Sequence, residues 1–181
     1  MFASAPAFEL KGGFPLIKTL GESISAKRRA MFQNLLEEYG DLESIPNDVW
    51  RQILPAEAFR VCRLNTMESA VSNSQLNRNH TPGVYSCVCC GTELFCSTHK
   101  FGAGWLSFSQ AIDGNVTRVP VFHHGVKRVE AQCTNCRSHL GYIYKDDVPP
   151  TGERFCVNSV ALDFAIEKFD QAVRKYSRQS M

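Results

Sequence analysis

The order of apolar and polar residues predicts helices in the first third of the chain. Residues 25–39 carry apolar side chains near helical spacing, and Gly40 follows them as a residue type that ends helices. Residues 46–54 and 55–63 each begin with proline, which the first turn of a helix tolerates. The pattern therefore predicts three helices, followed by an irregular connector over residues 65–82 that is rich in Asn and Ser.

From residue 83 the pattern changes to short runs of β-branched and aromatic residues separated by glycine, proline or Asp-Gly. These runs cover residues 84–86, 116–122, 126–131, 140–144 and 155–164. Runs of this kind favour strands, so the predicted fold class is mainly β (α+β) with a mostly antiparallel sheet structure. After the last run, apolar residues from Ile166 to Tyr176 recur at helical spacing and predict a C-terminal amphipathic helix with a polar tail.

Length, charge and the N-terminal sequence narrow the class of protein. A chain of 181 residues is long enough to bury a core, and its size favours one domain. The net charge of +2, with basic and acidic residues interspersed, predicts no nucleic-acid or anionic-membrane partner. No apolar run has the length of a membrane helix and no secretory signal is visible, which favours a soluble, cytoplasmic protein. Residues 1–30 hold five basic and two acidic residues, so mitochondrial import stays open as an alternative.

Four of the eight cysteines form two Cys-x-x-Cys pairs, which is the spacing of zinc-binding turns. The pairs are Cys87 with Cys90 and Cys133 with Cys136, separated by 42 residues. Four thiolates from two turns complete a tetrahedral site, and Gly91 lets the first turn reach a positive φ. We therefore predict one structural zinc ion that pins separate strands together. Redox-active dithiols are the alternative, and Cys89 is spaced poorly for a metal ligand.

Several further motifs follow one another between about residue 50 and residue 164. They include Pro82-Gly83-Val84-Tyr85, Gly104-Trp105-x-Ser107-Phe108, His139-Leu140-Gly141 and Arg154-Phe155-Cys156-x-Asn158. With the cysteine pairs, these motifs resemble the B-type methionine sulfoxide reductases, a family that reduces methionine-R-sulfoxide. The resemblance implies two antiparallel sheets, a structural zinc and, at the opposite end, a shallow substrate site. It divides the chain into a helical extension (1–45), a zinc-binding reductase-like domain (46–166), and a C-terminal helix and tail (167–181).

The resemblance implies that Cys156 is the nucleophile that attacks the sulfoxide sulfur. Such a cysteine must react as a thiolate, which an unperturbed thiol with a pKa of about 8.5 forms only in small part at neutral pH. Arg154 and Asn158 lie two residues away on either side, so an extended strand would place all three side chains on one face. They are the candidates that favour the thiolate. The alternative interpretations are an inert core thiol for Cys156 and structural roles for its two neighbours.

The substrate-binding residues implied by the resemblance lie in the Gly-Trp motif. Trp105 matches the tryptophan that packs on the methyl group of the substrate, and Phe108 is predicted to bind substrate beside it. The segment before Trp105 is about two residues shorter than is usual in the family, and Leu106 replaces the customary proline. A buried core tryptophan is the alternative for Trp105.

Tyr142 occupies the position where the family has a histidine implicated in protonating or orienting the sulfoxide oxygen. A tyrosine still donates a hydrogen bond, but its pKa of about 10 makes it a weaker acid–base group at neutral pH. His139 and Asp146 are the candidates that compensate for the missing histidine. For His139, a hydrogen-bonded structural role is the alternative.

Recycling requires a second thiol, because the attack converts Cys156 to a sulfenic acid. The usual family position for this resolving cysteine is Ala103 here, so we predict Cys62 as the first candidate and Cys96 as the second. The resemblance implies thioredoxin as the reductant, with another thiol as the alternative. The predicted partners are thus methionine-R-sulfoxide, in proteins or free, and a thiol reductant, with the chain acting as a monomer. A non-catalytic binding module on the same zinc-stabilised fold stays open as a different class of function.

Overall fold

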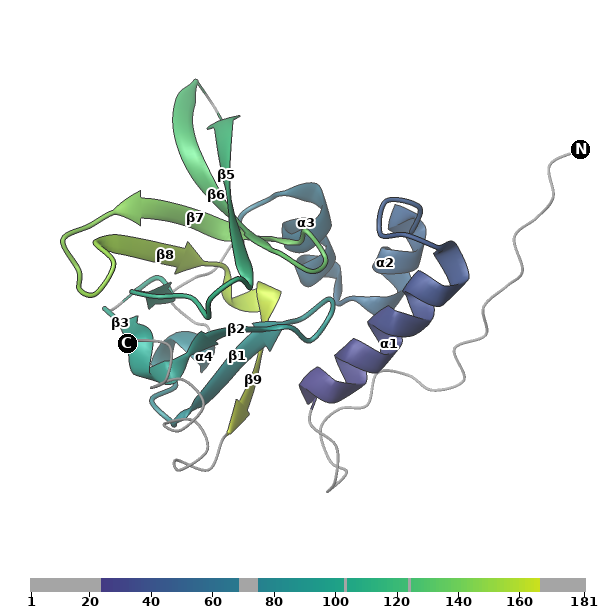
Figure 1. Ribbon diagram of the computed structural model, residues 1–181, viewed down its shortest axis with the longest axis horizontal. Helices are drawn as coiled ribbons and strands as arrows, with labels where there is room; N and C mark the ends of the chain where they lie inside the picture. Colours follow the sequence, from purple (N-terminus) through teal and green to yellow (C-terminus); the bar gives the residue numbers. More distant parts are fainter. Residues whose placement is uncertain (1–23, 69–74, 103, 124, 167–181) are drawn as a thin grey trace, which may run out of the picture.

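The computed structural model describes residues 24–68, 75–102, 104–123 and 125–166. In this part of the chain there are four α-helices and nine strands, and α1 and α2 lie beside the sheets (Figure 1). None of the helices in the described ranges is long and apolar enough to cross a membrane.

The three predicted helices are confirmed as α1 (Ile24–Tyr39), α2 (Asn47–Ile53) and α3 (Ala56–Leu64). The helices α2 and α3 begin directly after Pro46 and Pro55, because proline fits the start of a helix but not its interior. A fourth helix, α4 (Gln75–Arg78), lies in the connector predicted to be irregular, so that prediction is wrong for these residues. The amino group of Lys100 donates to three backbone carbonyls at α4 and just after it, a long-range contact that stabilises this turn of helix.

The strands form two antiparallel sheets, as the resemblance implied. The smaller sheet has the order β2-β1-β9, formed by β1 (Gly83–Cys87), β2 (Glu93–Cys96) and β9 (Leu162–Ile166). The larger sheet has the order β3-β4-β8-β7-β6-β5. Its strands are β3 (Lys100–Phe101), β4 (Ser107–Phe108), β5 (Val116–His123), β6 (Val126–Cys133), β7 (His139–Lys145) and β8 (Glu153–Val157).

One predicted strand is two strands in the structure. The apolar run 155–164 holds the end of β8, the short 3-10 helix η3 (Ser159–Ala161) and the start of β9, so it passes from the larger sheet to the smaller. The turn closes where the N–H of Ala161 donates to the Asn158 carbonyl at 3.1 Å. Of the predicted C-terminal helix, Ile166 ends β9 and the remaining residues lie outside the described ranges.

An aromatic core joins the two sheets. Phe95 of the smaller sheet stacks on Phe108 of the larger, with ring centroids 4.4 Å apart, and Tyr85 meets Phe108 edge-on at 5.0 Å. The same buried cluster includes Phe32 of α1 and Trp50 of α2, so the helices share one core with the strands. The predicted domain boundaries at residues 45 and 166 stay predictions.

Candidate active site and metal site

The four cysteines of the two pairs meet at one buried point. The sulfur atoms of Cys87, Cys90, Cys133 and Cys136 all lie within 4.8 Å of one another. In a tetrahedral site with zinc–sulfur bonds of about 2.3 Å, neighbouring sulfur atoms are separated by roughly 3.8 Å. The sulfurs of Cys87 and Cys136 are 3.5 Å apart and those of Cys90 and Cys133 are 3.6 Å apart, which fits a tetrahedral ion. Four buried cysteines are thus positioned to bind a metal, as predicted.

Both cysteine pairs lie on turns with the same backbone geometry. The N–H of Gly91 donates to the Cys87 carbonyl, and the N–H of Arg137 donates to the Cys133 carbonyl, each at 2.8 Å. Gly91 has a φ of 72° and Arg137 a φ of 54°, so both turns end in the left-handed region. The positive φ predicted for Gly91 is confirmed. The second turn reaches the same conformation with arginine, for which it costs energy.

Arginines from α1 and α3 hold the two metal-site turns against the helices. Arg29 of α1 donates to the Gly91 carbonyl at 2.9 Å, and Arg63 of α3 donates to the Cys136 carbonyl at 3.0 Å. The Arg63 guanidinium also lies over the Trp50 ring, 4.6 Å from its centroid. The N-terminal helices therefore support the metal site together with the sheets.

A pocket of about 260 Å³ brings together five of the predicted catalytic and substrate-binding residues. It is lined by Met67, Trp105, Gly141, Tyr142, Tyr144, Arg154, Cys156 and Asn158. All eight cysteines lie in the described residues, and Cys156 is the only one that is not buried. The pocket therefore contains the one thiol that is partly open to solvent.

Strand pairing places Cys156 between Ser107 and Tyr142. Cys156 of β8 is the register partner of Ser107 on β4 and of Tyr142 on β7. The Ser107 hydroxyl oxygen lies 3.8 Å from the Cys156 sulfur. A Cβ added at Gly141 would lie 2.0 Å from the Cys156 carbonyl oxygen, so only glycine fits there. Gly141 thus allows β7 to approach β8 closely next to Cys156.

Groups around Cys156 change its pKa in opposite directions. Burial raises the pKa of the Cys156 thiol and the Asp146 carboxylate adds to that rise, while the Ser107 hydroxyl and the Arg154 guanidinium lower it. Arg154 is itself paired with Asp146, with Nε and Oδ2 3.1 Å apart. Arg154 therefore acts in the predicted direction, but burial outweighs it. With a raised pKa, the thiolate fraction at neutral pH is smaller than in a free cysteine.

We expect Asp146→Asn to lower the pKa of Cys156, because it removes an anion that disfavours the thiolate and releases Arg154 from its partner. The pH dependence of iodoacetamide alkylation at Cys156, followed by peptide mass spectrometry, should shift to lower pH. Ser107→Ala is the matched control of opposite sign, since it removes a hydrogen bond that favours the thiolate. An unchanged or raised pKa in Asp146→Asn would show that this carboxylate does not act on the thiol.

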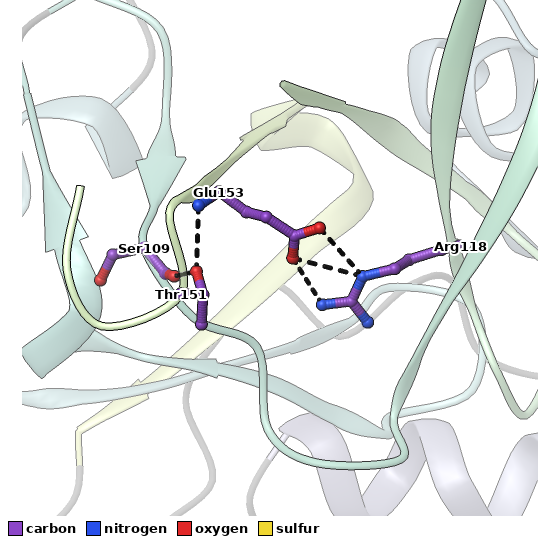
Figure 2. Close-up of polar contacts among 4 residues, drawn as sticks. All are labelled: Ser109, Arg118, Thr151 and Glu153. Atoms are coloured by element: carbon purple, nitrogen blue, oxygen red, sulfur yellow. Dashed lines mark hydrogen bonds and ion pairs between the residues drawn. The ribbon is translucent and has the colours of Figure 1, made fainter. Parts of the chain in front are cut away.

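Polar contacts fix the β7–β8 hairpin, the segment that leads into Arg154 (Figure 2). The Thr151 hydroxyl donates to the Ser109 carbonyl at 2.6 Å and accepts from the Glu153 N–H at 3.2 Å. The Glu153 carboxylate pairs with Arg118 of β5, and their shortest N–O distance is 2.7 Å. The hairpin is thus tied to the end of β4 and to β5, which fixes the strand that carries the pocket arginine.

His139 is buried behind the pocket rather than in it. Its Nδ1 lies 2.5 Å from a carboxylate oxygen of Glu130, and the residue is 1% exposed. The His139 ring meets the Tyr142 ring edge-on at 5.3 Å, and Arg128 lies over the Tyr142 ring at 5.2 Å. The geometry favours the structural interpretation of His139, which supports Tyr142 from the core side.

Phe108 lies in the core and does not line the pocket, so the structure does not bring this predicted substrate-binding residue to Cys156. The residue is fully buried and stacked on Phe95. Successive side chains of a strand point to opposite faces, so β4 directs Ser107 toward Cys156 and Phe108 away from it. The same alternation, applied to the sequence motif, indicates Ser107 as the residue that faces Cys156, which sequence analysis missed.

Neither candidate for the resolving thiol lines the pocket. Cys62 is 1% exposed in α3 and belongs to the same buried core as Cys89 and the metal-site cysteines. Cys96 is buried in β2. The structure therefore does not bring either cysteine to Cys156, because both belong to the packed interior.

Three residues that line the pocket, Met67, Gly141 and Tyr144, were not among the predicted site residues. Tyr144 lies two residues beyond Tyr142 on β7, so strand alternation indicates it once Tyr142 is chosen. Met67 comes from the connector between α3 and α4, where no pattern in the sequence indicates a pocket residue.

Together these features define a β-sheet protein with a buried four-cysteine metal site and one reachable thiol in a separate pocket. The chain matches the SelR domain family over residues 54–166. It is 45% identical over 120 residues to the peptide methionine sulfoxide reductase MsrB of Pseudomonas paraeruginosa, which covers 65% of this chain and 90% of that protein. The protein of the same name from a Synechococcus species is 42% identical over 126 residues, covering 68% of this chain and 91% of its own. The chain therefore belongs to the SelR-domain family, the B-type methionine sulfoxide reductases.

Proposed function

We propose that this chain reduces methionine-R-sulfoxide, in oxidised proteins or free, to methionine. The observation that carries this assignment is the position of Cys156, the one cysteine that is not buried, in a pocket that also contains the Trp105 indole. The names of the relatives, peptide methionine sulfoxide reductases, support the same chemistry. The nearby Arg154 favours a catalytic thiol over the alternative of a binding module, because its charge stabilises the thiolate.

Cys156 attacks the sulfoxide sulfur as a thiolate. The sulfur–oxygen bond of the substrate breaks, methionine leaves as the thioether, and the oxygen and one proton end on Cys156 as a sulfenic acid. The Trp105 indole provides an apolar wall for the methyl group of the substrate. Burial of one such carbon contributes about 0.8 kcal/mol, which favours a methionine side chain over polar ones.

Tyr142 donates a hydrogen bond to the sulfoxide oxygen. Burial raises the pKa of the Tyr142 hydroxyl, so the phenol keeps its proton at neutral pH. We expect Tyr142→Phe to lower kcat by about 10²-fold, because the ring stays and the donor is lost. Tyr142→His should raise kcat at neutral pH, since a histidine with a pKa of about 6.5 can transfer its proton to the sulfoxide oxygen instead of only donating a hydrogen bond. Steady-state kinetics against pH would check both, and an unchanged kcat in Tyr142→Phe would remove Tyr142 from the mechanism.

Asn158 acts as a positioning residue. Its side-chain amide donates to the Leu140 carbonyl at 3.0 Å and accepts from the Glu68 N–H at 3.2 Å. Asn158 thereby joins the end of β8 to β7 and to the connector after α3, and its amide groups are occupied. Arg154 is the neighbour of Cys156 that acts through charge.

An external thiol resolves the sulfenic acid. Of the eight cysteines, only Cys156 lines the pocket, which favours direct attack by thioredoxin or another thiol reductant. That attack releases water and forms a mixed disulfide, and a second thiol then restores Cys156. We expect Cys62→Ser to keep thioredoxin-linked turnover. Loss of that turnover, with a single turnover preserved, would restore Cys62 as the resolving thiol.

The metal site holds one structural zinc ion. A set of four thiolates at tetrahedral spacing suits zinc, and full burial is typical of a closed, structural site. Its chemical contribution is to pin β1 and the turn after β6 together, while the pocket supplies the reactive groups.

A direct test uses the purified protein, dithiothreitol and a peptide carrying one separated epimer of methionine sulfoxide. We expect the R epimer to be converted to methionine and the S epimer to remain, because B-type enzymes take one epimer. Binding without product from either epimer, from neutral to alkaline pH, would instead support the non-catalytic module.

A further inference from the structure

A methionine of the chain itself lines the pocket that contains Cys156. Met67 follows α3 in the connector, and it is 47% exposed although it lies against a pocket with an apolar wall. The pocket thus holds a reachable thioether and the reactive thiol of the same molecule. Because this pocket is proposed to receive oxidised methionine, an oxidised Met67 side chain would lie beside the thiol that reduces it.

Hydrogen bonds fix the backbone beside Met67. The N–H of Glu68 donates to the Asn158 side-chain oxygen at 3.2 Å. The Glu68 carboxylate in turn accepts from the Ser159 hydroxyl at 2.8 Å and from the Val160 N–H at 3.1 Å. The residue next to Met67 is therefore bound to the residues that directly follow β8. Met67 stays at the pocket whenever this part of the protein is folded.

An exposed thioether is a target for peroxides, which convert methionine to its sulfoxide. The Met67 side chain is unbranched and has three rotatable bonds, so it can present its sulfur in several orientations from a fixed backbone. Attachment to the same chain also makes the encounter with Cys156 intramolecular, which raises its effective concentration far above that of a free peptide.

We propose, on the basis of the function assigned above, that Met67 is an internal substrate of this enzyme. Hydrogen peroxide transfers one oxygen to the Met67 sulfur and leaves as water. Cys156 then attacks that sulfur, the sulfur–oxygen bond breaks, and Met67 returns to the thioether while Cys156 becomes a sulfenic acid. Two external thiols restore Cys156 and leave as a disulfide with release of water. Peroxide damage at the pocket is thereby repaired within the molecule.

The test begins by capping Cys156 as a methyl disulfide, so that peroxide can oxidise Met67 without oxidising the thiol. Catalase removes the peroxide, dithiothreitol then uncaps Cys156, and peptide mass spectrometry follows the Met67 sulfoxide with time. We expect its amount to fall to the share of the S epimer, with a rate constant that does not change with protein concentration. The Cys156→Ser variant, treated in the same way, should keep all of its Met67 sulfoxide.

Met31 is the matched internal control, because it is only partly buried but packs against the core and does not line the pocket. If the Met31 sulfoxide is reduced, its reduction takes place between molecules, so its rate constant should rise with protein concentration. A Met67 sulfoxide that disappears in proportion to protein concentration would overturn the intramolecular step, since repair would then be between molecules. Resistance of Met67 to peroxide would overturn it as well.

A peptide methionine-R-sulfoxide, assayed in parallel, separates the two levels of inference. If the peptide is reduced and the Met67 sulfoxide persists, internal repair is wrong and the proposed function stands. If neither is reduced, the proposed function fails.

Discussion

Replacement of Cys156 by serine is expected to abolish reduction of methionine-R-sulfoxide, with kcat lowered about 10³-fold or more. A serine hydroxyl keeps nearly the same shape but is far less nucleophilic toward sulfur than a thiolate, and it cannot form the sulfenic acid. Since Cys156 is only half-buried, the change should leave the unfolding temperature close to that of the natural chain. Product formation with dithiothreitol and circular dichroism melting would measure the two effects separately.

Cys96→Ser is the matched control for this experiment. Cys96 lies buried in β2 and does not line the pocket, so its replacement should lower stability somewhat and leave the chemical step in place. Turnover that survives in Cys156→Ser, or disappears equally in the folded Cys96→Ser, would show that the nucleophile has been assigned to the wrong sulfur.

Loss of one metal ligand should have the largest effect on folding. Cys133→Ser would leave three thiolates in a buried site that needs four ligands. Apparent binding free energies of structural zinc in small finger peptides are about 10–16 kcal/mol, whereas a whole domain is stable by only about 5–15 kcal/mol. We therefore expect Cys133→Ser to be largely unfolded at room temperature and to contain well below one metal ion per chain.

Cys89→Ser provides the control for the metal site. Cys89 is buried among the metal-site cysteines but is not one of the four that form the cluster. Its replacement should keep one metal ion per chain and a cooperative unfolding transition. Elemental analysis would measure the metal content of both variants, and thermal unfolding would show whether each one unfolds cooperatively. Full metal content in Cys133→Ser, or equal loss in Cys89→Ser, would mean that the ligand set is different.

Helices and most strands were predictable because their signals are local. Proline at the start of α2 and α3, and β-branched runs at β5, β6 and β7, depend only on neighbouring residues. The division of residues 155–164 between two sheets was not predictable, because the run contains no glycine or proline to mark the turn. That turn depends on Asn158, whose contacts with Leu140 and Glu68 join segments distant in sequence.

The candidate site was predictable wherever a motif or strand alternation describes it. Cys156, Arg154 and Trp105 follow from motifs, and alternation alone distinguishes Ser107 from Phe108. The burial of a cysteine could not be predicted in this way, because packing of the whole chain decides whether the cysteine lies in the pocket or in the core. For that reason Cys62 was a reasonable candidate from the sequence, yet it is buried in α3.

The hydrogen bonds from α1 and α3 to the metal-site turns limit how far the protein can be shortened. The part shared with the SelR domain family, residues 54–166, keeps Arg63 but lacks Arg29. It also lacks Phe32 and Trp50, whose buried rings belong to the common core. A fragment of this kind would expose apolar core side chains to solvent and would be prone to aggregate. For this chain, α1 and α2 are therefore needed for a soluble, folded reductase domain.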